Sequence, residues 1–224
     1  MTREAFVEME SQAGRLLPRR NAGVHTLNAA QGSVFLGQPA NPAPIPPAEA
    51  LAVVDFWRAA GPSRWFAKDP SFDRSFREQF LSLHEAAARG ELSGWIATPN
   101  AALALLLLLD QFPRNAFRGT PRMYATDKMA RHAAAAAIDA GHDRAVETQM
   151  RLFFCLPFGH SEDAADQDHS VALAQSLAEP NPSHAKRHRD IIRRFGRFPH
   201  RNPILGRTMT KEEQQYLDEG GYAG

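Results

Sequence analysis

The chain has 224 residues, 43% of them hydrophobic, and its 26 Lys and Arg nearly balance its 25 Asp and Glu. This length and apolar content predict one domain with a substantial core, with or without an arm. The near-neutral charge argues against a nucleic-acid partner. The single cysteine, Cys155, excludes an intramolecular disulfide and a zinc site built from several cysteines.

No segment predicts export or membrane insertion. The first thirty residues contain Glu4, Glu8 and Glu10 and lack the continuous apolar stretch of a signal peptide. The longest apolar run, residues 101–109, is shorter than the ~20 residues that a membrane-spanning helix needs. We therefore expect a cytoplasmic protein without a membrane partner.

The chain divides near residue 47. Five prolines fall between Pro39 and Pro47, and proline both fixes φ and lacks an amide donor, so this stretch should be an extended spacer. We predict a Pro-rich arm over residues 1–46, mostly disordered or loosely docked. A single domain should follow over residues 47–224.

From residue 47 the signals are helical, and alternating β-branched runs are absent. Helix starts are indicated by Asp69-Pro70, Thr98-Pro99, Ser161 and Ser183, and by the capping box that begins at Thr210. We expect helices over residues 48–60, 70–89, 99–109, 121–140, 142–156, 161–177, 183–195 and 210 onward. Seven or eight helices with short connections imply an all-α domain of antiparallel helix pairs.

Two of these helices should form the core. Phe72, Phe76, Phe80 and Leu83 recur at helical spacing and make one apolar stripe. Residues 101–109 are apolar on every side, so their helix should be central.

Two segments have nearly the same sequence and are predicted to be loops. One is Phe112-Pro113-Arg114-Asn115, and the other is Phe198-Pro199-His200-Arg201-Asn202. Loops on a rigid helical scaffold often carry function. These two segments therefore indicate where a site lies, although no motif identifies its chemistry.

Asp110, Arg114, Asn115 and Arg118 cluster at the end of the apolar helix. An arginine fork suits a carboxylate or a phosphate. Alternatively, the arginines bond the last carbonyls of that helix, and Asp110 forms a structural ion pair with one of them.

His160 precedes Ser161-Glu162-Asp163 at a helix start. Helix capping accounts for the serine and the acids but not for the histidine. His160 is therefore a candidate general acid or base, and a histidine held by backbone in a turn is the alternative.

A metal site is the weaker interpretation of these histidines. His184 and His188 share a helix face, but basic residues surround them. His160 with Glu162, Asp163, Asp166 and His169 is a better set that lacks a clear third ligand. We expect no metal and no cofactor.

Residues 186–207 are the most basic part of the chain, and three interpretations remain open. They are a solvated face, a phosphate-backbone surface or an inward-facing small-anion site. Phe195, Phe198 and Pro199 indicate a packed segment, which favours the small anion. The nucleophile elbow and the phosphate-binding loop motif are both absent, and a buried Cys155 would be a poor nucleophile.

Several blocks resemble a bacterial family of unknown function, the domain-of-unknown-function family nine-two-four, over roughly residues 47–219. The blocks are Trp65-Phe66-Ala67-Lys68-Asp69-Pro70, Leu109-Asp110-Gln111-Phe112-Pro113-Arg114-Asn115, Pro157-Phe158-Gly159-His160-Ser161-Glu162-Asp163 and the stretch from His188 to Asn202. The resemblance implies an α-helical fold similar to a tetratricopeptide-type superhelix and implies no established activity.

We predict one polar pocket that binds a small anionic ligand, with acid–base catalysis by His160 or His200. The expected ligand-binding residues are Asp110, Arg114, Asn115, Arg118, Glu162, Gln167, His188, Arg197, Arg201 and Asn202. The alternative is a helical-repeat module that binds a protein partner and in which these residues only hold the helices together.

Overall fold

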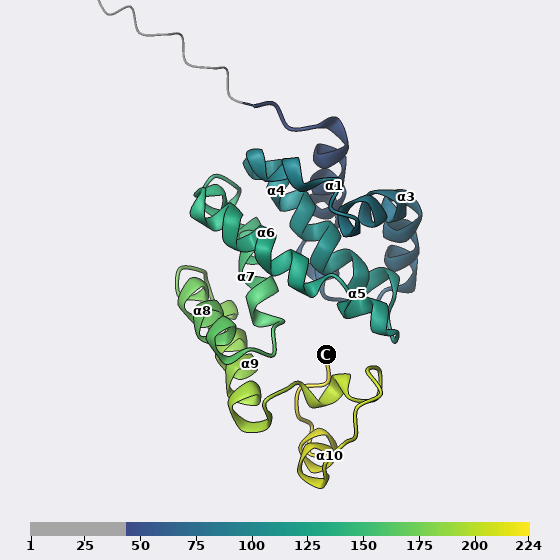
Figure 1. The fold of residues 1–224 in the computed structure, drawn as a ribbon, viewed down its shortest axis with the longest axis vertical. Coiled ribbons are helices and arrows are strands. Elements are labelled where there is room, and N and C mark those ends of the chain that lie inside the picture. The colour runs from purple at the N-terminus through teal and green to yellow at the C-terminus, as the bar shows by residue number, and fades with distance from the viewer. Residues whose placement is uncertain (1–43) are drawn as a thin grey trace, which may run out of the picture. The chain divides into compact units, whose positions relative to one another are not determined.

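The computed structural model describes residues 44–224, which are helical and contain no β-strand (Figure 1). The predicted all-α class is confirmed. The α-helices of at least eight residues in this range are α1 (Ala48–Ala60), α3 (Pro70–Ala88), α4 (Pro99–Leu106), α6 (Asp127–Asp139), α7 (Leu152–Gly159), α8 (Ala164–Ala174), α9 (Asn181–Phe195) and α10 (Lys211–Asp218). The shorter helices are α2 (Pro62–Trp65) and α5 (Phe112–Ala116). Residues 1–43, with most of the predicted arm, lie outside the described part.

The core is built around α4. Every residue from Ala101 to Leu109 is at most 5% exposed, as expected for a helix that is apolar on all sides. Helix α4 contacts α1, α6 and α7, while α8 packs between α7 and α9 (Figure 1). The phenylalanine stripe of α3 is buried at Phe72, Phe76 and Phe80, which confirms that prediction. Within residues 44–224 no helix combines the length and the apolar character that a bilayer crossing requires.

Helix starts were predicted well where an aspartate or a threonine precedes the helix. The Asp69 carboxylate accepts the backbone N–H groups of Ser71 and Phe72 at 2.9 and 3.2 Å. Thr210 forms the predicted capping box with Glu213.

The two serine caps were wrong. Asp163, not Ser161, caps α8, because its carboxylate accepts the N–H groups of Ala165 and Asp166. The Ser161 hydroxyl instead donates to the Asp166 carboxylate at 2.6 Å. Helix α9 begins at Asn181, before Ser183.

Two predicted helices are shorter than expected. Residues 121–124 form a single 3-10 turn that precedes α6, and residues 142–150 form two such turns that precede α7. In the second case the chain reverses at Gly141, whose φ of 74° is left-handed, and His142 Nε2 contacts the Ile96 carbonyl at 2.9 Å. This tertiary contact holds the segment as a turn where local sequence pattern favours a helix.

Candidate functional site

The first Phe-Pro segment is helical, which corrects the predicted loop. Helix α4 continues through a π-helical turn at Leu107–Gln111 into α5, and the Phe112 N–H bonds the Leu107 carbonyl, five residues back. Pro113 has no N–H, so a carbonyl of the preceding turn lacks its usual backbone donor. A wide turn accommodates that loss, and such turns often occur at functional sites.

Side chains supply the missing donors. His84 Nδ1 bonds the Leu108 carbonyl at 2.9 Å, and the Thr126 hydroxyl donates to the Leu109 carbonyl at 2.6 Å. Arg114 Nη1 donates to the Asp110 carbonyl at 2.7 Å, as expected for an arginine near a helix end. The carbonyls of residues 107–110 in this turn are therefore all bonded, which holds Asp110 in position.

Asp110 is 1% exposed, and each oxygen of its carboxylate accepts a hydrogen bond. Its Oδ1 lies 2.8 Å from His160 Nδ1 and 3.2 Å from Arg114 Nη1. Its Oδ2 accepts the Gln111 amide at 2.7 Å. The predicted ion pair between Asp110 and an arginine is present, and His160 joins it from the end of α7.

A second arginine, Arg201, is linked to Arg114 by Asp127, which lies at the start of α6. Asp127 lies 2.9 Å from Arg114 Nη1 and 3.6 Å from Arg201 Nη1. Arg201 also donates to the His160 carbonyl at 2.9 Å, and its guanidinium lies over the rings of Tyr124 and Phe198. We call Asp110, Arg114, Asp127, His160 and Arg201 the Asp110 cluster.

The charge states in the cluster follow from burial and from the neighbouring charges. Burial alone would raise the pKa of Asp110, but the Arg114 charge and the hydrogen bonds from His160 and Gln111 hold it well below its usual range. Burial and the Arg114 charge lower the pKa of His160, although Asp110 opposes this. At neutral pH the pair is an ionised carboxylate and a neutral imidazole. Because a carboxylate only accepts, the proton resides on Nδ1, and Nε2 keeps its lone pair.

His188 and His200 lie beside the cluster without bonding it. Their rings are 4.6 and 5.1 Å from the ring of Tyr222, and the His188 ring is 6.5 Å from that of His160. Burial is the main cause that lowers the pKa of His188 to about 3 and that of His200 to about 4. Both histidines are therefore neutral near pH 7.

Four other predicted site residues hold the surrounding chain together. Glu162 accepts a two-pronged ion pair from Arg207 and the Phe198 N–H, and Arg197 binds Glu213 at 2.6 and 2.8 Å. The remaining two are buried amides. The Gln167 amide donates to the carbonyls of residues 158, 159 and 161, and the Asn202 amide lies 3.4 Å from a methionine sulfur.

Asn115 and Arg118 turn away from the cluster toward α3. Asn115 donates to Asp73 at 2.7 Å, and Arg118 contacts the same carboxylate at 2.5 and 3.1 Å. Arg118 also bonds the Ala67 carbonyl. These two residues tie α5 to α3, so the structure does not place them with Arg114 in one site.

Two guanidinium nitrogens of the cluster are buried without a partner. Arg114 Nη2 and Arg201 Nε have no hydrogen-bond acceptor within residues 44–224. Arg201 is only 6% exposed. A buried donor without a partner costs ~1–3 kcal/mol, so each of these atoms calls for an explanation.

Tyr124, Asp127 and Tyr222 were not predicted from the sequence. Asp127 resembles an ordinary acidic residue in the first turn of a helix, and no local signal shows that it joins two distant arginines. The tyrosines follow no motif. Their position beside the cluster is apparent only in the folded structure.

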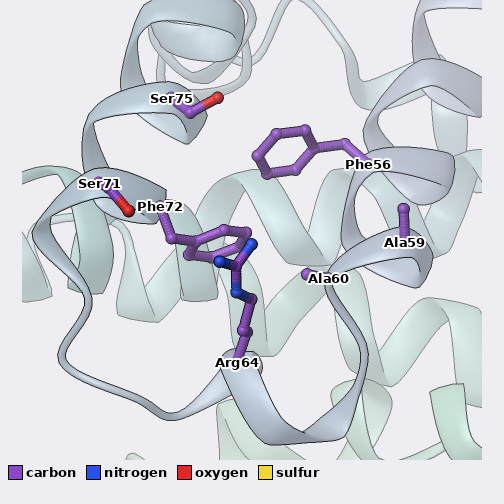
Figure 2. Close-up of a pocket in the computed structure, with 7 residues that line it drawn as sticks. All are labelled: Phe56, Ala59, Ala60, Arg64, Ser71, Phe72 and Ser75. Carbon is purple, nitrogen blue, oxygen red and sulfur yellow. The ribbon is translucent and has the colours of Figure 1, made fainter.

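Two surface cavities lie away from the cluster. One, of about 320 Å³, is lined by Phe56, Ala59, Ala60, Arg64, Ser71, Phe72 and Ser75, and Figure 2 shows Arg64 beside the Phe72 ring. The other, of about 330 Å³, is lined by residues that include Pro44 and Thr98. Neither includes a residue of the Asp110 cluster. Among residues 44–224, no three His, Cys, Asp or Glu side chains are placed to share a metal ion.

These features define an all-α domain in which two arginines, two aspartates and a histidine from distant helices meet in a buried cluster. Residues 53–221 match the family described as "Bacterial protein of unknown function (DUF924)", and the chain belongs to that family. It is also similar to a solved protein of unknown function from Agrobacterium tumefaciens, with 56% identity and a TM-score of 0.75. That match covers 76% of this chain and 97% of the other. No curated protein matches the chain.

Proposed function

We propose that the Asp110 cluster binds a small anionic ligand, a phosphate or a carboxylate, and that His160 transfers a proton to or from it. The observation that carries this proposal is the pair of buried donors, Arg114 Nη2 and Arg201 Nε, that have no partner within residues 44–224. Both arginines contact Asp127, so their free nitrogens belong to one cluster. An anion that accepted from both would remove the cost of leaving them unbonded.

The geometry also suits proton transfer. Asp110 holds the Nδ1 proton of His160 at 2.8 Å, which fixes the tautomer and leaves Nε2 as a base. Because the pKa of His160 is lowered, the neutral, basic form of its imidazole predominates at pH 7. In this proposal the arginines hold negative charge that develops on the ligand while His160 moves the proton.

A different observation supports a second candidate function. Each arginine in and around the cluster has an acidic partner: Arg114 and Arg201 have Asp127, Arg197 has Glu213, and Arg207 has Glu162. A balanced set of this kind also suits a structural role. In that case the chain is a helical-repeat module with a tetratricopeptide-like superhelix, and another surface binds a protein partner.

Thermal-shift screening against phosphates and carboxylates separates the two candidates. A ligand at 100 times its Kd should stabilise the parent by about 2.7 kcal/mol. Arg114→Lys and Arg201→Lys keep the charge but lose the planar fork, so either should reduce the shift strongly. Arg193→Lys is the matched control, because Arg193 pairs with Asp168 at the surface and is 55% exposed.

Three results decide the matter. A shift in the parent and the control that is lost in both cluster variants supports the anion site. A shift that survives in both variants places the ligand elsewhere. If no anion shifts the parent and both variants lose stability, the arginines are structural, and the interaction module is preferred.

A further inference from the structure

The residues that follow α10 return to the histidines beside the site. We call Glu219–Gly224 the strap. In Figure 1 it leaves α10 and runs back toward the rest of the domain, where the chain end is marked. The Tyr222 ring packs 4.6 Å from the ring of His188 and 5.1 Å from that of His200. The strap therefore covers the two histidines that flank the Asp110 cluster.

Tyr222 also lies within the field of the cluster arginines. Burial raises the pKa of its phenol, while the charges of Arg201 and Arg114 oppose that rise. The ring packs against the small apolar group of Ile191, Ile192 and Phe198. The Tyr222 ring thus packs against both this apolar group and the two histidines that flank the cluster.

The N–H groups of Glu219 and Gly220 bond carbonyls of α10, and beyond Gly220 few hydrogen bonds hold the strap. The Gly221 N–H donates to the Tyr216 carbonyl and the Tyr222 N–H to the Tyr216 hydroxyl, both at 2.9 Å. Gly221 sits so close to Tyr216 that an added methyl group would collide with its carbonyl oxygen and come within 2.5 Å of its ring. The next residues, Ala223 and Gly224, are exposed. A segment at the chain end that is held by few hydrogen bonds opens at lower cost than the core helices.

We propose that the strap is a lid of the Asp110 cluster, closed by Tyr222 and lifted when the anion enters. This inference rests on the proposed function, because a lid needs a ligand to admit. It accounts for the two unbonded guanidinium donors, which are buried while neither described cavity reaches them. A ligand that binds only the open form pays for the opening, so its apparent Kd rises by the inverse of the open fraction.

Two substitutions open the lid without touching the cluster. Gly221→Ala forces the strap off Tyr216, because the obstacle is backbone and cannot rotate away. Tyr222→Ala keeps the backbone hydrogen bonds of the strap to Tyr216 and removes the ring that covers His188 and His200. Gly94→Ala is the control, since no atom lies within 4 Å of the methyl group that it adds and its φ is not left-handed.

The first measurement is the rate at which diethyl pyrocarbonate modifies each histidine of the full chain, followed by peptide mass spectrometry. Exposed His132 is the internal reference. In the parent and the control, His188 and His200 should react more slowly than His132. In both opening variants their rates should rise about tenfold or more, as for local opening of a weakly held segment. Unchanged rates in both variants, or fast reaction in the parent, would overturn the lid.

The second measurement is the Kd for inorganic phosphate. If the strap must lift before binding, Gly221→Ala should lower the Kd by the same factor by which it raises the histidine rates. Weaker binding in Gly221→Ala would overturn the lid and make Tyr222 a ligand contact instead. Absence of phosphate binding in every variant would count against the proposed anion site, whereas the histidine rates alone still decide whether the strap opens.

Discussion

At the residue scale, Pro113 changes the backbone geometry of the turn that precedes it. It removes one amide from the end of the central helix, and the chain responds with a π-helical turn whose carbonyls bond His84, Thr126 and Arg114. That turn fixes Asp110 opposite His160. The candidate site therefore includes a backbone irregularity that accommodates the proline.

Also at the residue scale, buried His188 predicts a loss of stability in acid. Its pKa is lowered to about 3, so the folded chain binds this proton only near pH 3, whereas the unfolded chain binds it below ~6.5. The contribution of neutral His188 to the free energy of unfolding is therefore fully present above pH ~6.5 and decreases as the pH drops toward 3. Between pH 6.5 and 4.5 the free energy of unfolding should fall by about 2–3 kcal/mol on account of this residue.

Urea denaturation across that pH range measures the effect. His188→Gln removes the titration and can still donate to the Gly159 carbonyl, which His188 Nδ1 now contacts at 3.2 Å. The variant should therefore lose less stability in acid than the parent. His132→Gln, at an exposed position, should follow the parent curve. Parallel curves for the parent and His188→Gln would show that His188 is not the cause.

Four members of the Asp110 cluster were named from the sequence as candidate site residues. Asp110, Arg114, His160 and Arg201 were predicted because each stands at a helix end or beside a proline, where local pattern is informative. Asp127 could not be predicted, because its role comes from two arginines that are far away in sequence. Asn115 and Arg118 lie outside the cluster for the converse reason, since these sequence neighbours of Arg114 contact Asp73 of another helix.

At the scale of the element, α3 shows how an apolar stripe becomes a core. Phe76 is 0% exposed, and its ring lies 5.1–5.2 Å from the rings of Phe56, Trp57 and Phe112. Phe76→Ala should lower the free energy of unfolding by ~3–5 kcal/mol, measured by chemical denaturation. Phe66→Ala removes the same atoms from a side chain that is 59% exposed, and it should cost far less. Equal costs would mean that the stripe does not carry the core.

The elements themselves differ in how well the sequence predicts them. Strong periodicity with an aspartate cap, as in α3, was predicted almost to the residue. Residues 142–150 were not, because their alanine and polar pattern also suits a helix, whereas the structure has 3-10 turns there, after left-handed Gly141 and with His142 bonded to Ile96. The second Phe-Pro segment falls between these cases, with a single 3-10 turn at Pro199–Arg201. Short helical turns are decided by tertiary contacts that no local window contains.

At the scale of the whole molecule, the Asp110 cluster links distant parts of one fold. Asp110 and Arg114 come from the end of the central helix, Asp127 from α6, His160 from the end of α7, and Arg201 from the turn after α9. Arg114 has two acidic partners, Asp110 and Asp127, whereas Arg201 has only Asp127 within the cluster, so loss of Asp127 leaves the buried Arg201 charge without its carboxylate, which is costly. The cluster thus joins the packing of four segments, and the anion proposed above would bind where all four meet.

We expect residues 1–43 to contribute little to the stability of the fold that follows them. Helix α1 begins at Ala48, and the first buried residue of the core in the described part is Ala50, while the family match spans 53–221. Deleting residues 1–43 should therefore change the free energy of unfolding by less than ~0.5 kcal/mol, a Tm change below about 2 °C for a domain of this size. Deleting residues 1–54 instead removes Ala50, Val53 and Val54, which are all buried, and should lower the Tm by many degrees. Differential scanning calorimetry of both deletions decides the point: if the shorter deletion costs as much as the longer one, the first 43 residues belong to the stable domain.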